Sequence, residues 1–391
     1  MKNLKGYALS VIVTAFLITC VITGCSAGTA VPGEGTSPAA DEKVTITDLA
    51  GRTVVLKKDI QRIVLLRSKD IYQLAALLGD ELPKRLVAWG PDLKKDDNEG
   101  YKKITEKYPE LINLPESGDV YDEALSPEQV MKFKPDLVIM DKFLIDGGYK
   151  YVEKFEASGL PCIYTDETSD PLKGPQNSIA LLGKVLGKEE RGNEILQFAN
   201  EKIDSVLTRI DKLTAPPPSV YLEQGNTGPS KFGATYGGTG NPKKYNSWGA
   251  ILKRLKVNNI ADGVASGQVP INPEYVLRAN PDLIVITGQN WTAVPDSMKL
   301  GYYSTPADAQ KLLNGFLKRP GWSGLNAVEN KRIYSVFHAT SQVFIFSCIE
   351  ALAKYCYPEE FKDLNPEKDL KEYYDRFMPI SYSGIWMLGI S

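Results

Sequence analysis

The chain has 391 residues and a formal net charge of −2, and 43% of its residues are hydrophobic and 24% charged. This composition is typical of globular proteins and excludes a disordered tail protein, a collagen and a coiled coil. A charge so close to zero also argues against a broad nucleic-acid surface, which needs a basic excess. The only histidine, His338, excludes a metal centre built from several histidines.

The first 25 residues have the pattern of a secretory signal. Two lysines precede an apolar run that ends at about Ile22, and this run is too short and too broken to favour a permanent membrane span of about 20 residues. It closes with Ile22-Thr23-Gly24-Cys25, which resembles the lipobox of bacterial lipoproteins. We therefore expect residues 1–25 to be a lipoprotein signal peptide with Cys25 as the lipidation site. The alternative is an ordinary signal peptide with a chance cysteine.

Residues 26–43 are rich in Gly, Ser, Thr, Pro and Ala and show no apolar periodicity. Such a composition is typical of a flexible tether. A lipid anchor followed by a tether predicts an extracytoplasmic protein that is held at the bacterial cell membrane.

Three cysteines follow the tether, namely Cys162, Cys348 and Cys356. The last two lie in one expected helix, roughly 12 Å apart at 1.5 Å per residue, which is beyond the reach of a disulfide. We expect buried or semi-buried free thiols.

Strand and helix patterns alternate over residues 44–187. A strand pair over Val44–Leu56 flanks a turn at Ala50-Gly51. The elements expected after it are strand Arg62–Leu66, helix Asp70–Leu78, strand Leu86–Trp89, helix Ser126–Phe133, strand Asp136–Met140, helix Tyr149–Ser158 and strand Pro161–Tyr164. This alternation predicts a mostly parallel sheet with helices on both faces.

Residues 188–214 differ, because apolar side chains recur there at helical spacing. The pattern predicts one helix of nearly 40 Å, which ends before Pro216-Pro217-Pro218. The elements expected beyond it are strand Val220–Leu222, helix Trp248–Leu255, helix Pro273–Ala279, strand Asp282–Thr287, helix Ala307–Leu317, strand Arg332–Val336 and helix Phe344–Tyr355. We therefore predict an α/β fold of two doubly wound lobes, residues 44–187 and 215–391, joined by one long α-helix.

A repeated segment supports two related lobes. The sequence of Ser126–Ile139 returns in similar form as Asn272–Val285. Each copy has a helix N-cap residue, proline at the first helical position and glutamate at the second, and then Pro-Asp-Leu at the start of a strand. Glu128 and Glu274 should therefore occupy the same place in the two lobes.

Together these features resemble the substrate-binding lipoproteins of ABC importers for iron–siderophore complexes, haem and cobalamin. The resemblance covers about residues 44–360, and its matching segments are Thr47–Arg52, Arg62–Val64, the two repeats, the long helix and Arg319–Tyr334. In that family the long helix is a stiff connection, and the ligand binds in the cleft between the lobes. The resemblance therefore implies a stiff, monomeric protein whose closure is small.

The resemblance also implies partners. In that family an acidic residue of each lobe docks onto basic residues of the permease dimer, which works with its ATPase, and the matching residues here are Glu128 and Glu274. The alternative is that each glutamate only stabilises its helix dipole.

Ligands of open α/β sheets bind beyond the carboxyl ends of the strands, and this rule gives a candidate binding set. Aromatic and cationic side chains dominate it, which suits a bulky, partly flat, anionic metal complex. The candidate ligand-binding residues are Arg67, Lys69, Trp89, Tyr121, Lys142, Tyr164, Tyr236, Trp248, Trp291 and His338.

Three roles stay open for His338, which follows an expected strand. It can ligate the metal of a bound chelate or haem, hydrogen-bond to the ligand without touching metal, or pack as an ordinary loop histidine. One histidine cannot build a metal cage, so we expect a metal that a chelator already holds rather than bare zinc or manganese.

We therefore expect an extracytoplasmic solute-binding protein that captures a siderophore-like iron(III) complex and delivers it to an ABC permease. The alternatives are a haem or corrinoid (cobalamin-type) carrier and, more distantly, a membrane-tethered secreted enzyme. No nucleophile elbow or paired-carboxylate motif supports an enzyme, so no catalytic residue and no intrinsic cofactor are expected. The tail, residues 370–391, is apolar enough that it should pack on the second lobe.

Overall fold

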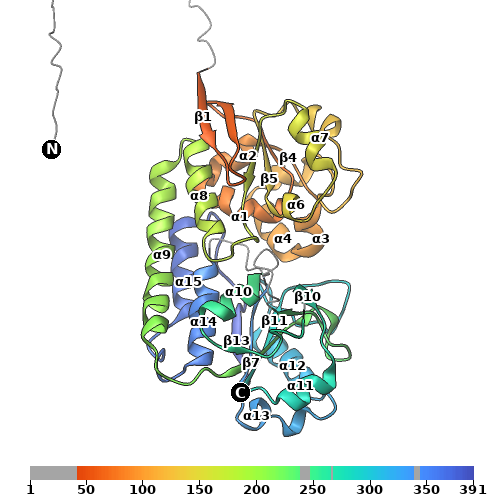
Figure 1. The fold of residues 1–391 in the computed structure, drawn as a ribbon. Coiled ribbons are helices and arrows are strands. Elements are labelled where there is room, and N and C mark those ends of the chain that lie inside the picture. Colours follow the sequence, from red (N-terminus) through yellow and green to blue (C-terminus); the bar gives the residue numbers. More distant parts are fainter. Residues whose placement is uncertain (1–41, 238–246, 266, 339–343) are drawn as a thin grey trace, which may run out of the picture. The chain divides into compact units, whose positions relative to one another are not determined.

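The computed structural model describes residues 42–237, 247–265, 267–338 and 344–391 (Figure 1). The predicted signal peptide, Cys25 and nearly all of the tether lie outside these residues. Within the described ranges, no helix is both long and apolar enough to cross a membrane. The fold is mixed α/β, as predicted, and we call the parts built around its two main sheets the first and second lobes.

A parallel sheet of four strands, in the order β4-β3-β5-β6, forms the centre of the first lobe. Its strands are apolar and almost entirely buried, as strands covered on both faces are. An antiparallel hairpin of β1 (Lys43–Thr47) and β2 (Thr53–Lys57) precedes it, at the predicted place. The sheet strands are β3 (Ile63–Leu65), β4 (Leu86–Trp89), β5 (Leu137–Asp141) and β6 (Cys162–Thr165).

Five of the first-lobe helices described here were not indicated by the sequence patterns, namely α2, α3, α4, α6 and α8. α2, α3 and α6 have only four or five residues, α4 is largely polar, and α8 begins at Gly174-Pro175. The helices are α1 (Ile71–Leu78), α2 (Leu82–Arg85), α3 (Asp92–Asp96), α4 (Asn98–Lys107), α5 (Pro127–Met131), α6 (Phe143–Asp146), α7 (Tyr151–Ala157) and α8 (Gly174–Val185).

The predicted long helix is α9 (Glu189–Lys212), whose 24 residues span about 36 Å. It packs against α8 of the first lobe and α14 of the second (Figure 1). A Cβ on Gly183 of α8 would lie 3.7 Å from the Cα of Gly192 of α9, so the two glycines allow these helices to pack closely. The helix therefore belongs to both lobes.

The second lobe has a five-stranded sheet in the order β13-β12-β11-β7-β9, parallel except for β13. Its strands, with the separate pair β8–β10, are β7 (Ser219–Gln224), β8 (Thr235–Gly237), β9 (Asn258–Asn259), β10 (Gly267–Val269), β11 (Leu283–Gly288), β12 (Ile333–Phe337) and β13 (Met387–Gly389). Its helices are α10 (Ser247–Arg254), α11 (Pro273–Ala279), α12 (Pro306–Phe316), α13 (Asn326–Glu329), α14 (Ile345–Cys356) and α15 (Pro366–Phe377).

The internal repeat has the predicted structure in both lobes. α5 begins at Pro127 and α11 at Pro273, and each is followed by an inner strand of its sheet, β5 or β11. The backbone N–H of Glu274 donates to the side chain of Asn272 at 2.8 Å, so Asn272 is the N-cap that the sequence indicated.

Two further predictions are confirmed. The tail packs on the second lobe, because β13 pairs with β12 and the side chain of Trp386 is buried. Cys162, Cys348 and Cys356 are free and buried.

Candidate functional site

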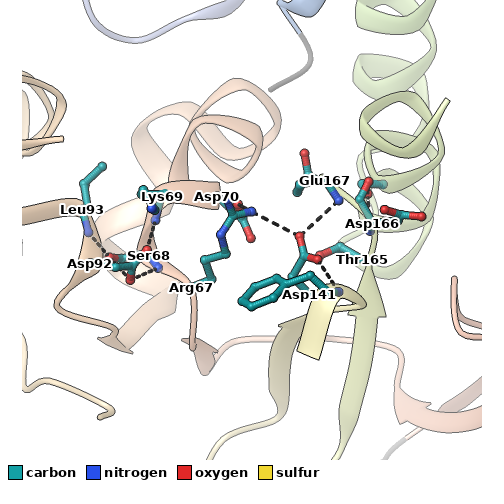
Figure 2. A network of polar contacts seen from close by, with 12 residues as sticks. Arg67, Ser68, Lys69, Asp70, Asp92, Leu93, Asp141, Thr165, Asp166 and Glu167 are labelled. Carbon is teal, nitrogen blue, oxygen red and sulfur yellow. Dashed lines mark hydrogen bonds and ion pairs between the residues drawn. The ribbon is translucent and has the colours of Figure 1, made fainter. Parts of the chain in front are cut away.

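The strand ends of the first lobe bring together three cations, Arg67, Lys69 and Lys142, which we call the cation group. Arg67 and Lys69 follow β3, and Lys142 follows β5 directly. Asp92, from the chain after β4, accepts hydrogen bonds from the backbone N–H groups of Ser68 (2.8 Å) and Lys69 (3.1 Å) and so fixes the turn that carries them (Figure 2).

Arg67 is held by carboxylates of its own lobe. Its Nη1 donates to Asp70 Oδ1 at 2.8 Å and to Asp141 Oδ2 at 3.2 Å, and only 6% of the residue is exposed. Asp141 is itself fixed, because its two oxygens accept the backbone N–H groups of Phe143 (2.8 Å) and Glu167 (3.1 Å) (Figure 2). The guanidinium is therefore preorganised as part of a buried network.

The two lysines of the cation group also have carboxylate partners. Lys69 Nζ lies 3.0 Å from Asp96 Oδ2, and Lys142 Nζ lies 3.5 Å from Asp166 Oδ2. Lys69 Nζ also lies 5.5 Å from the centre of the exposed Tyr121 ring. That ring stacks on Phe143, with 5.8 Å between the centroids, so aromatic surface adjoins the cations.

In the second lobe, three aromatic rings surround the only histidine. The ring centroids of Tyr236 and Trp248 each lie 6.4 Å from that of His338, and the centroid of Trp291 lies 5.2 Å from it. We call these four residues the aromatic cup. Tyr236 and Trp248 are buried, whereas Trp291 and His338 are partly exposed.

His338 is oriented by a hydrogen bond between its Nδ1 and Thr287 Oγ1 at 2.8 Å. Its pKa is lowered from 6.5 to about 3, mainly by burial and further by the positive charge of Lys69. The imidazole is therefore neutral at physiological pH. Lys69 of the first lobe therefore lies where its positive charge disfavours protonation of His338.

Amide groups complete the polar side of the cup. Gln268 Nε2 donates to Gln224 Oε1 at 2.9 Å and to the Tyr236 hydroxyl at 3.2 Å. Within the part of the chain that the structure describes, no group of three or more His, Cys, Asp or Glu side chains is arranged to hold a metal ion. The rings and amides of the cup can stack on and hydrogen-bond to a ligand that has aromatic and polar parts.

Trp89 and Tyr164 are not brought into these two groups. Trp89 lines a separate cavity of about 40 Å³ together with Tyr101, Ile112 and others, which is far smaller than a pocket for a metal chelate. Tyr164 is fully buried in the first-lobe core, and the guanidinium carbon of Arg52 lies 4.3 Å from the centre of its ring.

Glu128 and Glu274 are both exposed near the start of their helices. The pKa of the Glu128 carboxyl is lowered, first by its own backbone N–H and then by Ser126. Both carboxylates are accessible to a partner.

The sequence patterns missed three residues of the site, Phe143, Gln268 and Glu99. Phe143 follows the strand end β5 by two positions, so the strand-end rule could have included it. Glu99 accepts hydrogen bonds from Asn290 Nδ2 (3.0 Å) and the backbone N–H of Tyr303 (3.1 Å) and so joins the lobes beside Trp291. No local signal indicates such a long-range contact.

A family model described as periplasmic binding protein matches residues 68–337. The crystal structure of the TroA-like periplasmic binding protein FepB from Veillonella parvula is similar, with a TM-score of 0.82 and 39% sequence identity, over 89% of this chain and 100% of that chain.

Two curated proteins are similar in sequence. The molybdate-binding protein MolA of Haemophilus influenzae is 24% identical over 393 residues, which cover 94% of this chain and 97% of that protein. The uncharacterized ABC transporter substrate-binding lipoprotein YvrC of Bacillus subtilis is 24% identical over 335 residues, which cover 82% of this chain and 87% of that protein.

Proposed function

The chain belongs to the periplasmic binding protein family and is a solute-binding protein of an ABC transporter, and from this premise we propose that its cargo is a siderophore-like iron(III) complex. The observation that carries the proposal is the aromatic cup around a neutral histidine, whose pKa Lys69 of the cation group helps to lower. Aromatic faces and oriented polar groups recognise a bulky organic shell around a metal.

A haem or a corrinoid is the second candidate, and His338 is the observation that favours it. Since Nδ1 is engaged by Thr287, only Nε2 is left to face a ligand. A neutral imidazole that is oriented through its other nitrogen has the arrangement of a metal ligand. A metal complex with an open coordination position would use it. A ferric complex without an open position would only stack on the rings or accept a hydrogen bond.

The absorbance spectrum of the protein purified from its native host tests both candidates. A ferric hydroxamate or catecholate band supports the siderophore proposal, whereas haem or corrinoid bands support the second candidate. A protein that carries no chromophore and binds no ferric complex, haem or corrinoid on titration would contradict both. Turnover of any such complex would favour the distant alternative of a tethered enzyme, although the relatives and the family are transport proteins.

We further propose that Glu128 and Glu274 dock the loaded protein onto the permease dimer, which works with its ATPase. Both are exposed at equivalent places of the repeat. Reversing both charges, Glu128→Arg with Glu274→Arg, should abolish import and leave ligand affinity unchanged. The matched control reverses two other exposed glutamates, Glu153 and Glu329. Unimpaired import, or lost affinity, in the first pair would refute docking.

Membrane anchoring through Cys25 is also a proposal, which rests on the lipobox sequence. Replacing Cys25 by serine should move the protein from the membrane fraction to the medium or periplasm. Retention in the membrane fraction would refute the anchor.

A further inference from the structure

An ion pair is buried at the end of β7. Arg319 Nη1 lies 2.7 Å from Glu223 Oε2, and Arg319 Nη2 lies 2.8 Å from Glu223 Oε1, so the guanidinium contacts both carboxylate oxygens. Glu223 is fully buried and Arg319 is 5% exposed. The next residue of β7 is Gln224, which accepts a hydrogen bond from Gln268 beside the aromatic cup. We call Glu223 and Arg319 the buried pair.

The buried pair also holds the loop of residues 225–233, which follows β7. Three backbone carbonyls of this loop accept hydrogen bonds from Arg319, namely those of Gly228 (3.2 Å to Nη2), Pro229 (2.9 Å to Nε) and Lys231 (2.7 Å to Nη2). At the end of the loop, the backbone N–H of Gly233 donates to Glu223 Oε1 at 2.7 Å. The two side chains of the pair therefore fix the loop along its length.

This loop leads directly into β8, which carries Tyr236 of the aromatic cup. The carbonyl of Ala234 accepts a hydrogen bond from the backbone N–H of Gln224 at 2.8 Å, so the chain runs back beside β7. Tyr236 follows two residues later, and its ring packs near that of His338. The position of the Tyr236 ring thus depends on the loop that the buried pair fixes.

Stability alone does not require charges at this place. Removing two charges from water costs about as much as their attraction returns, so apolar residues of similar volume often stabilise a protein equally well. A guanidinium differs because it carries several N–H donors in a rigid, planar fork. Arg319 uses this fork to bind one carboxylate and three carbonyls at once, which sets their directions.

We propose that the buried pair positions the binding site, in that Glu223 and Arg319 set the loop of residues 225–233 so that Tyr236 closes the aromatic cup. This inference rests on the proposed function and assigns two further residues to the same site. Both are positioning residues, since they are buried and act on a ligand only through Tyr236.

Crystal structures of two variants test this role. The double variant Glu223→Leu with Arg319→Met replaces the charges with apolar side chains, whereas Arg319→Lys keeps the positive charge but lacks the fork. In both we expect the Tyr236 ring to leave the position in which its centroid lies 6.4 Å from that of His338. Arg319→Lys leaves Glu223 with a cationic partner, so it should fold even if the double variant does not. An unmoved Tyr236 ring in ligand-free crystals of Arg319→Lys would overturn the proposal.

Ligand affinity gives a second readout. The probes are ferrichrome, ferric enterobactin, haemin and cyanocobalamin, each titrated by the quenching of tryptophan fluorescence. Every probe that the unaltered protein binds should bind about tenfold more weakly to Arg319→Lys, because the displaced ring loses its contact with the probe. Equal affinity in the variant and the unaltered protein would also overturn the proposal.

The matched control is Arg332→Met. Arg332 likewise donates to two backbone carbonyls of the second lobe, those of Tyr355 (2.8 Å) and Cys356 (3.1 Å), but it precedes β12, at the end opposite to His338. This variant should lose stability in urea unfolding and keep the affinity of the unaltered protein. An equal loss of affinity in Arg332→Met and Arg319→Lys would mean a general loosening of the lobe and would contradict positioning.

Two results distinguish the positioning role from the cargo. If the unaltered protein binds none of the four probes, the proposed function falls, while the place of Tyr236 in the ligand-free crystals still decides the role of the buried pair. If a probe binds equally well to the unaltered protein and to Arg319→Lys, the transport function stands and only the positioning role falls.

Discussion

His338 lies among three aromatic rings, and Thr287 fixes one of its nitrogens. Protonation of the ring would place a positive charge in a partly buried apolar site that is already close to the positive charge of Lys69. The pKa of His338 therefore falls to about 3. The residue cannot act as a pH switch between pH 5 and 8. Its chemistry towards a ligand is that of a neutral donor or acceptor.

This state can be measured directly, because the chain has one histidine. We expect the imidazole NMR resonances of His338 to stay constant from pH 8 to pH 5. The unfolded ring takes up a proton near pH 6.5, while the folded ring does so only near pH 3. Stability is therefore lost as the pH falls through this window, by at most about 1.4 kcal/mol per pH unit. His338→Gln should remove this part of the slope in urea unfolding. A titration midpoint near 6.5 would contradict the prediction.

From the sequence, residues of the site could be predicted only where they lie just beyond the end of a strand. Lys142 and His338 directly follow their strands, and the structure brings each into one of the two groups. Trp89 and Tyr164 lie within β4 and β6 instead, where side chains point to the covered faces of the sheet. Sequence periodicity gives the end of a strand more reliably than the direction of its last side chain.

At the scale of elements, α14 carries a group that the binding function does not require. Glu350 is buried on this helix and faces Asp369 of α15 and Lys202 of α9. Its Oε2 has no hydrogen-bond partner in the described structure. Burial and then the negative charge of Asp369 raise its pKa from 4.5 to about 9. The junction of these three helices therefore contains a carboxyl that stays protonated at neutral pH.

Replacing this carboxyl by an amide should stabilise the fold. Between pH 4.5 and about 9 the folded state keeps a proton that the unfolded state has lost, so stability falls as the pH rises. Glu350→Gln removes that loss, and we expect a gain of about 1–3 kcal/mol at pH 8 and almost none at pH 4.5 in urea unfolding. Glu372→Gln, at a partly exposed position of α15, serves as the control. A loss of stability at both pH values would show that Glu350 is ionised and paired.

At the scale of the whole molecule, α9 is one connection between the lobes and Glu99 of α4 is another. Glu99 accepts hydrogen bonds from the Asn290 side chain and from the backbone N–H of Tyr303. Gly301 leaves room for the Glu99 carboxylate, because a Cβ on Gly301 would lie 2.7 Å from Glu99 Oε2. The tail supports the same segment, because Gly301 and Ile385 exchange backbone hydrogen bonds of 2.8 and 3.1 Å. Relative motion of the lobes is thus restrained beside Trp291, which follows Asn290.

Glu99→Ala should remove the hydrogen bonds of Glu99 to Asn290 and Tyr303 and leave α9 unchanged. The backbone N–H of Tyr303 loses its acceptor, so its hydrogen exchange should accelerate. The free energy of unfolding should also fall by about 1–3 kcal/mol, because the Asn290 amide loses its partner as well.

X-ray scattering measures the effect on lobe closure. In the unaltered protein we expect nearly the same radius with and without ligand, since both connections oppose closure. In Glu99→Ala the two radii should differ more. Glu110→Ala, an exposed glutamate just beyond α4, should change neither quantity. Unchanged Tyr303 exchange in Glu99→Ala would contradict this prediction.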